Sequence, residues 1–263
     1  MRSARRWFKV AGLLTISLAM VFTSLAQEGE GDTARGSVLL TYLGHQCFLI
    51  EGSDGTRVLC DPYTSPQPTG LHPLPDGLTA DAVLITHDHL DHSNAGAIAG
   101  QPLILDAAGE WQIGSVTVRG YEGLHGGSAG RSGVVNVAFV IEVEGVRILH
   151  LGDSGVITDE ETVAAIADCD VVIMNVHPMV IPWFKSMPFM DSIGARTMIP
   201  SHYSHFACCL WSTSQPAIDG FLAYPDPKNI VVGSDQVELY PEMPREFIIM
   251  TPSLLDESFL SEE

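Results

Sequence analysis

The sequence Thr-His-Asp-His-Leu-Asp-His-Ser at residues 86–93 is the strongest signal in this chain. Its His-x-His-x-Asp-His pattern places His87, His89, Asp91 and His92 close together, directly after an apolar stretch. Neutral imidazole and carboxylate are ligands that zinc, manganese and iron accept, and several must converge to hold an ion. On a tight loop, His87 and His89 can point to one ion while Asp91 and His92 face a second. We therefore interpret the stretch as a metal-binding loop rather than a solvated polar turn.

The remaining ligands must come from elsewhere in the chain, because a catalytic zinc site typically takes three protein ligands and a water, whereas this motif offers two ligands per ion. Three candidates stand at turn-like places that end or interrupt strand-like runs. They are His125 in Gly-Leu-His-Gly-Gly-Ser, Asp153 in His-Leu-Gly-Asp-Ser-Gly and His202 in Met-Ile-Pro-Ser-His-Tyr.

With these segments, and with Tyr-Leu-Gly-His at 42–45 and Cys-Asp-Pro at 60–62, residues 37–240 resemble the metallo-β-lactamase superfamily. Within that superfamily, the chain resembles the branch that contains the ascorbate-6-phosphate lactonase and related metal-dependent hydrolases. The segments occur in the same order as in the family. It implies that His87, His89 and His125 hold one ion, that Asp91, His92 and His202 hold the other, and that Asp153 bridges both. The chain departs from the branch at residues 171–178, which read Val-Val-Ile-Met-Asn-Val-His-Pro where related proteins usually carry a Pro-Ile-Gly-like turn. The substrate is therefore left open.

The expected cofactors are two divalent ions, with zinc as the first choice and manganese or iron as alternatives. Two ions a few ångströms apart can share a water and lower its pKa to roughly 7, which generates hydroxide at neutral pH. Asp91 could orient this hydroxide and accept its proton, and the resemblance places Asp153 between the two ions. Asp91 and Asp153 are therefore the candidate catalytic residues. The expected reaction is hydrolysis of a lactone, ester or amide carbonyl in a small-molecule substrate. A phosphodiesterase, a phospholipase or a β-lactam hydrolase on the same core is an alternative, and so is a metal-binding protein without turnover.

Five further residues are candidates for supporting the ligands or donating protons: His45, Asp61, His177, Tyr203 and His205. Each lies near a ligand in sequence or where the resemblance places it beside the metals. A structural role is the alternative, such as a backbone hydrogen bond for His45, a loop cap for Asp61 and packing for Tyr203. His150 is expected beside the ligands rather than among them.

The first 26 residues predict a secretory signal peptide. Arg2, Arg5, Arg6 and Lys9 precede the apolar run 10–22, and Ser24 and Ala26 would place cleavage before Gln27. An uncleaved membrane anchor is the alternative, although the run is short for a bilayer span. Residues 4–8, Ala-Arg-Arg-Trp-Phe, partly match a twin-arginine signal. We therefore expect an exported protein, periplasmic or extracellular, with no stable membrane insertion after cleavage.

Composition favours a single large α/β domain, because the chain has 263 residues, 46% of them hydrophobic and 17% charged. The predicted organisation is a linker at 27–36, a hydrolase domain at 37–252 and an acidic tail at 253–263. Without residues 1–26, which carry four basic and no acidic side chains, nine basic residues face 32 acidic ones, a formal charge of −23. Such a surface repels nucleic acid and argues against a nuclease. A homo-oligomer is left open.

Five cysteines are an odd number for an exported protein, and their spacing shows no disulfide framework. Cys47, Cys60 and Cys169 lie in or beside strand-like runs and are expected to act as small buried hydrophobes. For the adjacent Cys208 and Cys209, loop packing or a disulfide is favoured over metal binding.

Periodicity and turn signals predict an α/β fold, an αβ/βα sandwich of four layers in which two mixed sheets are flanked by helices. Residues 62–79 are rich in Pro and Gly and predict a loop that could wall the site. Strands are expected at 37–43, 46–51, 56–60, 81–86, 103–106, 115–119, 134–143, 146–151, 171–176 and 197–200, and near Ile230 and Val237. Helices are expected from the metal loop to about Ala99, from a capping box at Thr158 and Glu161 to about Ala167, and at 185–196 and 216–223.

Overall fold

The structure is a computed structural model that describes residues 37–65, 71–177, 179–202, 228–232 and 234–254. Several predictions lie outside these residues. They are the signal peptide, the linker, the helix at 216–223, Tyr203, His205, Cys208, Cys209 and the tail beyond Leu254. Among the described residues, no helix is long and apolar enough to cross a membrane.

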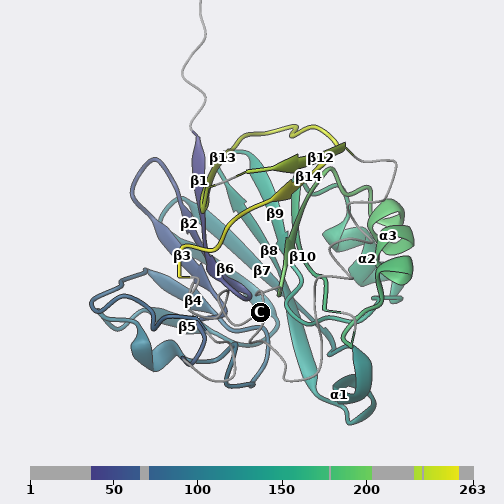
Figure 1. Cartoon of the computed structure of the whole chain (residues 1–263), viewed down its shortest axis with the longest axis horizontal. Coiled ribbons are helices and arrows are strands. Elements are labelled where there is room, and N and C mark those ends of the chain that lie inside the picture. Colours follow the sequence, from purple (N-terminus) through teal and green to yellow (C-terminus); the bar gives the residue numbers. More distant parts are fainter. Residues whose placement is uncertain (1–36, 66–70, 178, 203–227, 233, 255–263) are drawn as a thin grey trace, which may run out of the picture. The chain divides into compact units, whose positions relative to one another are not determined.

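Two sheets form the centre of the fold (Figure 1). The first has six strands in the order β13-β1-β2-β3-β4-β5. Its strands are β1 (Val38–Gly44), β2 (Cys47–Glu51), β3 (Arg57–Cys60), β4 (Ala82–Leu84), β5 (Leu103–Leu105) and β13 (Gln236–Leu239). The strands from β13 to β3 pair antiparallel, whereas β3, β4 and β5 pair parallel. The sheet is therefore mixed, as predicted.

The second sheet has eight strands in the order β12-β14-β11-β10-β9-β8-β7-β6. They are β6 (Gly109–Ile113), β7 (Val116–Leu124), β8 (Val135–Val143), β9 (Val146–His150), β10 (Val171–Asn175), β11 (Thr197–Ser201), β12 (Lys228–Val231) and β14 (Glu246–Ile249). Pairing is antiparallel from β6 to β9 and parallel from β9 to β12. This sheet is also mixed, which confirms the predicted fold class.

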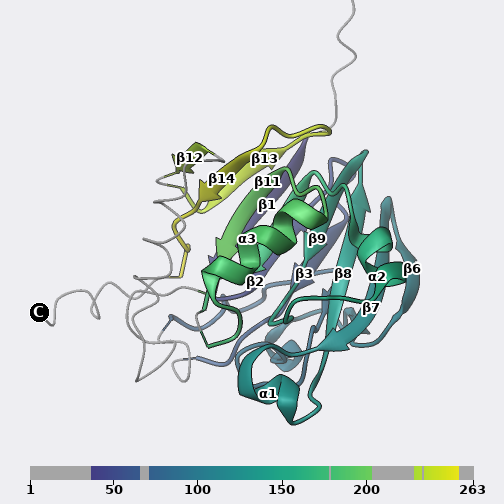
Figure 2. The same cartoon turned by 90° about the vertical axis from the view of Figure 1, so that its right-hand side faces the viewer.

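Side chains on β8 alternate between two cores, because successive residues of a strand point to opposite faces. Val137 and Phe139 belong to a cluster that also contains first-sheet residues such as Leu40. Ala138 and Val140 belong to a cluster with residues of α2 (Glu160–Ile166) and α3 (Trp183–Ser192). Figure 2 shows these two helices over the outer face of the second sheet. The inner face therefore packs on the first sheet and the outer face on helices.

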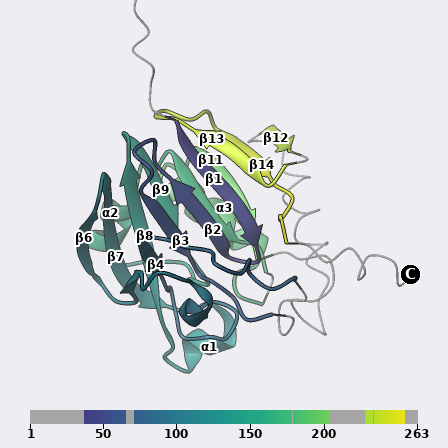
Figure 3. The same cartoon turned by 90° about the vertical axis from the view of Figure 1, so that its left-hand side faces the viewer.

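The outer face of the first sheet is covered, among the described residues, by loops and a short turn (Figure 3). The predicted helix from the metal loop to Ala99 is wrong, because only a 3₁₀ turn forms, η1 (Ala95–Ala97). Asn94 explains the difference: its backbone N–H donates to Pro62 O at 2.7 Å and its side chain to Tyr63 O at 3.0 Å. These bonds tie the segment to the preceding loop instead of to a helical ladder.

The predicted capping box at Thr158 and Glu161 is also wrong, because the N-cap lies one residue later in the chain. Asp159 is the N-cap, and its carboxylate accepts hydrogen bonds from both N and Oγ1 of Thr162 at 2.8 Å. A carboxylate that accepts two hydrogen bonds competes well with a threonine hydroxyl for the cap position. Helix α2 therefore begins at Glu160 and ends at Ile166.

Other boundaries and elements differ from the predictions as well. The helix expected at 185–196 is α3, which ends at Ser192 because Gly194 adopts a left-handed conformation with φ +64°. The sequence patterns missed β6, β14 and the short helix α1 (Gly127–Arg131). The three described cysteines, Cys47, Cys60 and Cys169, are buried and free, as expected.

Candidate metal centre

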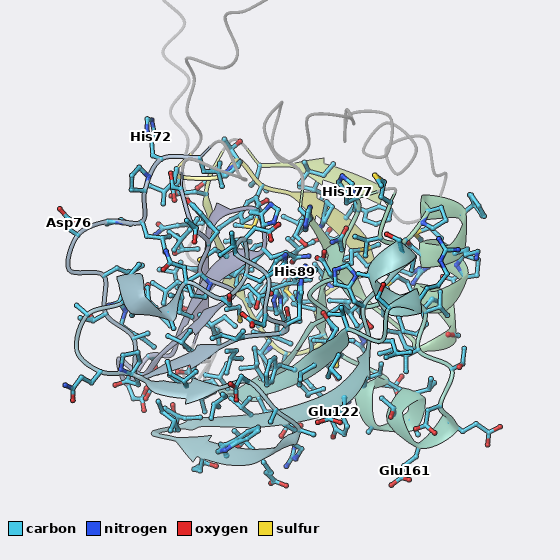
Figure 4. The ribbon with its side chains drawn as sticks, turned by 90° about the horizontal axis from the view of Figure 1, so that it is seen from below. His72, Asp76, His89, Glu122, Glu161 and His177 are labelled. Atoms are coloured by element: carbon cyan, nitrogen blue, oxygen red, sulfur yellow. The ribbon has the colours of Figure 1, made fainter. Side chains whose placement is uncertain are left out.

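The candidate ligands follow strands whose carboxyl ends lie at one edge of each sheet. His87 comes after β4 and Asp61 after β3, which pair parallel in the first sheet. Asp153 follows β9 and His202 follows β11, which flank β10 in the second. Open α/β sheets place ligand sites at such carboxyl ends. In Figure 4, His89 lies near the centre of the view and His177 lies above it, whereas His72 and Asp76 lie at the periphery.

The metal loop is shaped by hydrogen bonds to Asp61. The backbone N–H of Thr86 donates to Oδ1 of Asp61 at 2.8 Å, and the Thr86 hydroxyl donates to Oδ2 at 2.8 Å. Within the loop, the N–H of His92 donates to the carbonyl of His89 at 2.9 Å, which closes a tight turn. As a result, Nε2 of His87 and Nδ1 of His89 lie 2.9 Å apart. The tight loop inferred from the motif is therefore present.

All seven predicted ligands fall into three overlapping groups in which the potential ligand atoms lie within 4.8 Å of one another. One group is His87, His89 and His125, and another is His87, His92 and Asp153. The third is His45, Asp91, His92 and His202. The first and third groups contain the two trios that the family resemblance implies. His45, expected only to support the ligands, lies within the third group.

Asp153 lies between these groups. Its Oδ2 atom is 3.3 Å from Nε2 of His125 and 3.5 Å from Nε2 of His202, and Oδ1 is 3.6 Å from Nε2 of His92. The residue is 3% exposed. One carboxylate thus faces a histidine from each predicted trio, as a bridging ligand would.

The groups fit a cation. The Nε2 atom of His92 is buried without a hydrogen-bond partner among the described residues, and it faces oxygens of Asp91 at 3.7 Å and Asp153 at 3.6 Å. The other ring nitrogen, Nδ1, lies 3.1 Å from Oδ2 of Asp61. An imidazole whose second nitrogen is held by a carboxylate is the usual arrangement of a metal-binding histidine.

Electrostatics also prepare the site for positive charge. Burial disfavours the charged form of every group, yet hydrogen bonds and neighbouring imidazoles outweigh it and hold the pKa values of Asp61, Asp91 and Asp153 well below their usual range. Burial lowers the pKa of His87 to about 3, which keeps this imidazole neutral. For His92, the nearby carboxylates of Asp153, Asp61 and Asp91 overcome burial and raise the pKa to about 9. The carboxylates around His92 therefore favour positive charge at this place.

The supporting residues that the structure describes lie at the site. Nε2 of His45 is 2.9 Å from Oδ2 of Asp91, and its φ of +57° is a conformation rare for residues other than glycine. Asp61 is also in this region, with φ +42°. Buried His177 has its ring 5.2 Å from that of His202, and Nε2 of buried His150 is 2.9 Å from Asp61. Backbone strain of this kind concentrates at functional sites.

Four buried polar residues around Asp153 escaped the sequence analysis: Gln46, Asn136, Asn175 and Ser201. Asn136 holds the backbone, because its Oδ1 accepts from the N–H of Asp153 at 3.0 Å. Asn175 lies in the stretch that departs from the family pattern, which was the only available signal. Gln46 directly follows His45 in the chain, and nothing in the local sequence marks it.

A pocket of about 420 Å³ borders the site. Its lining includes His125 and Ser154, the residue next to Asp153, together with apolar Leu124, Val156 and Ile157. The charged lining residues are Glu122, Arg131 and Asp159. The volume suits a small molecule, since ligand pockets typically enclose about 300–1,000 Å³.

The fold and site match known proteins. A sequence model described as the β-lactamase superfamily domain matches residues 39–202. A UPF0173 metal-dependent hydrolase of Korarchaeum cryptofilum is 28% identical over 194 residues, which cover 64% of this chain and 84% of that protein. Another from Methanosarcina barkeri is 28% identical over 200 residues, with coverage of 64% and 84%.

Solved structures agree with these matches. A protein from Thermotoga maritima superposes with a TM-score of 0.63 at 26% identity, covering 81% of this chain and 98% of that one. That protein is described as a zinc-dependent hydrolase of the metallo-β-lactamase superfamily. An isothiocyanate hydrolase from Delia radicum gut bacteria shares the fold, with a TM-score of 0.55 at 15% identity and coverage of 81% and 96%. The family match spans more than half of the chain and contains all seven predicted ligands, so the chain belongs to the β-lactamase superfamily.

Proposed function

We infer that this protein is a metal-dependent hydrolase, and we propose that it works with two divalent ions. The relatives named above support the general activity. The observation that carries the finer proposal is the position of Asp153, whose Oδ2 lies within 3.5 Å of both His125 and His202. If each set of imidazoles holds an ion, a carboxylate between the two sets balances the positive charge of both ions.

In this proposal His87, His89 and His125 hold one ion, Asp91, His92 and His202 hold the other, and Asp153 contacts both. Such a pair of ions, when bound, lowers the pKa of a shared water and stabilises negative charge that develops on a substrate oxygen. Mixed imidazole and carboxylate ligands suit zinc, and also manganese or iron. The chain itself supplies Asp91, which accepts the proton of the attacking water, and His45, which orients that carboxylate from 2.9 Å.

We propose a carbonyl substrate, namely a lactone, ester or amide. The pocket beside His125 supports this choice, because Arg131 is the only Lys or Arg among the described residues that line it, whereas Glu122 and Asp159 are acidic. Apart from the proposed ions, this lining offers little positive charge to a phosphate group. The narrower likeness to the ascorbate-6-phosphate lactonase branch stays a prediction.

The test is a side-by-side screen of the purified protein, loaded with zinc or manganese, against lactones, esters, amides, phosphodiesters and β-lactams. We expect turnover of a carbonyl substrate that chelation abolishes and added metal restores, together with two ions per chain by elemental analysis. Turnover confined to phosphodiesters would refute the carbonyl substrate but leave the proposed metal site in place. One ion per chain at full activity would refute the dinuclear proposal.

We also propose that the protein is exported. The basic start, the apolar run at 10–22 and the small residues Ser24 and Ala26 support a cleaved signal. The measurement is N-terminal sequencing of the mature protein after cell fractionation. We expect Gln27 as the first residue in the exported fraction, and an uncleaved chain confined to the cytosol would contradict this.

A further inference from the structure

Two side-chain amides contact the carboxylate of Asp153 on the same oxygen. Nδ2 of Asn175 lies 2.5 Å from Oδ1 of Asp153, and Nε2 of Gln46 lies 3.4 Å from it. Both amides are buried, with Gln46 0% and Asn175 3% exposed. The other oxygen, Oδ2, faces His125 and His202. Oδ1 also lies 3.6 Å from Nε2 of His92. Both amides thus engage Oδ1, whereas Oδ2 faces two candidate ligands and neither amide.

The orientation of each amide follows from partners whose hydrogen-bonding roles cannot be reversed. The backbone N–H of His177 can only donate, and it reaches Oδ1 of Asn175 at 2.6 Å, so Nδ2 must face Asp153. The carbonyl of Gly152 can only accept, and it lies 3.0 Å from Nε2 of Gln46. This orientation turns Oε1 of Gln46 towards the hydroxyl of Ser201, 2.8 Å away, and that hydroxyl also lies 2.9 Å from the carbonyl of Met174. Both NH₂ groups are thus directed towards Asp153.

The amides come from separate elements. Gln46 lies in the turn between β1 and β2 of the first sheet, and Asn175 is the last residue of β10 in the second. Ser201, the last residue of β11, fixes the far end of Gln46. The position of Oδ1 therefore depends on both sheets and not only on the loop that carries Asp153.

Neutral donors suit a carboxylate that must bind cations. A buried carboxylate needs hydrogen bonds to offset its desolvation, and an arginine or lysine would provide them while cancelling the charge. An amide donates without carrying a charge. Asn175 and Gln46 therefore stabilise ionised Asp153 and leave its negative charge available on Oδ2.

We propose that Asn175 and Gln46 are positioning residues that engage Oδ1 of Asp153 and thereby reserve Oδ2 for contact with both metal ions. This inference rests on the proposed dinuclear function. Without the amides, the carboxylate can rotate and both oxygens compete for the ions. The affinity for the second ion should then fall, and the coordination geometry of the ions should change.

The experiment titrates the metal-free, full-length protein with Co²⁺ and records the number of ions bound and their d–d absorption bands. Asn175→Leu roughly keeps the size of the side chain and removes the donor to Asp153 together with the acceptor of the His177 N–H. Gln46→Met removes the donor and the oxygen near Ser201 at the second position. We expect Asn175→Leu to bind the second Co²⁺ about 10- to 100-fold more weakly, with shifted bands. Gln46→Met should have a smaller effect in the same direction, because its hydrogen bond is longer and shared with Gly152.

Thr197→Val is the matched control. Thr197 begins β11, the strand that ends at Ser201, and its buried hydroxyl donates to Pro244 O at 2.8 Å. Its loss should lower the melting temperature without changing the Co²⁺ bands. This comparison separates a general loss of buried hydrogen bonding from an effect on the site.

The outcomes distinguish this inference from the function on which it rests. If the wild-type protein binds two Co²⁺ and folded Asn175→Leu gives the same affinity and bands, the positioning role is refuted and the dinuclear site stands. If the wild-type protein binds only one Co²⁺, the dinuclear function itself is wrong. Should Asn175→Leu fail to fold, Gln46→Met decides, and wild-type affinity and bands in that variant would refute the proposal.

Discussion

Nε2 of His150 lies 2.9 Å from Oδ2 of Asp61, although 89 positions separate the two residues in the chain. Asp61 follows β3 of the first sheet and His150 ends β9 of the second, and both are fully buried. The same oxygen is 3.1 Å from Nδ1 of the candidate ligand His92. One carboxylate oxygen therefore links the two sheets next to the metal site.

Replacing Asp61 with asparagine should destabilise the protein and weaken metal binding. Oδ2 accepts from two imidazoles and Oδ1 accepts from the backbone of Thr86, so either orientation of the new amide sets its NH₂ group against a donor. We expect a loss of about 3 kcal/mol in the free energy of unfolding, typical of breaking a buried charged network. Metal affinity should fall about 10- to 100-fold. Urea denaturation and metal titration measure the two effects.

Asp170→Asn is the control for this variant. The Asp170 carboxylate is likewise held by hydrogen bonds, from the backbone N–H groups of Arg147 at 2.9 Å and Glu242 at 2.8 Å, but it directly precedes β10, at the end of that strand away from the ligands. It should lower stability without changing metal affinity. Equal metal affinities in wild-type protein and Asp61→Asn would show that Asp61 has only a structural role.

Asp153→Ala and His89→Ala should each abolish turnover of the substrate identified in the screen described above. Asp153 faces both sets of imidazoles, and His89 belongs to a single set. Loss of one ligand should reduce kcat/KM by about 100-fold or more, since removing even a supporting group of a metal site costs about 10- to 100-fold. The matched control is His72→Ala, because His72 is exposed and lies at the periphery. Wild-type rates in either ligand variant would rule out the two-ion mechanism.

Gly152→Ala should destabilise the fold because of a steric overlap. Gly152 has φ +53°, and a Cβ atom there would lie 2.4 Å from Oγ1 of Thr86. Gly77→Ala separates the two causes, since Gly77 has φ +77° but no atom within 4 Å of the added Cβ. The control should cost about 1 kcal/mol from backbone strain alone, and Gly152→Ala about 2 kcal/mol more. Equal urea midpoints for the two variants would contradict the close contact.

In the metal-free protein, stability should fall as the pH is lowered from about 6.5 to about 4. Burial lowers the pKa of His45 to about 4 and that of His87 to about 3, whereas both titrate near 6.5 in an unfolded chain. Between these values the unfolded state binds more protons, so acidification favours it. Each such histidine contributes about 1.4 kcal/mol per pH unit. Urea denaturation of chelator-treated protein at pH 6.5 and pH 5 measures the slope.

His92 does not reverse this trend. Its pKa is raised to about 9, so its contribution is complete below pH 6.5 and is lost only as the pH rises towards 9. His45→Asn is the control, because asparagine tolerates the positive φ at this position and does not titrate. This variant should show a shallower slope, and a wild-type slope would mean that His45 is not buried in its neutral form.

The metal loop could be predicted from sequence because its ligands are adjacent in the chain, and adjacency constrains geometry. Distant ligands such as His202 were proposed because they end strand-like runs and because the family resemblance assigns them, and strand ends in an α/β fold converge at one edge. Gln46 and Asn175 could not be found in this way. Their positions depend on how two sheets pack, and a buried glutamine in a turn resembles any other polar turn residue in sequence.

Local signals also failed where tertiary contacts intervene. The stretch after His92 has helical composition, but hydrogen bonds from Asn94 to residues 62 and 63 hold it in a loop. The cap of α2 shifted by one residue because both Thr158 and Asp159 can cap a helix, and the capping-box spacing favoured Thr158 although aspartate is the stronger N-cap residue. Such differences moved element boundaries but not the sheets that carry the ligands.

The candidate ligands span 115 positions, from His87 to His202, and come from loops of both sheets. In the proposed two-ion arrangement, neither ion has all its ligands until both sheets have folded, so metal loading should follow the docking of one sheet on the other. The surroundings in which the protein completes its folding then determine which ions compete for it. Under the export proposed above, a chain transported unfolded would load from the medium outside the cytosol, whereas one transported folded would carry ions acquired in the cytosol.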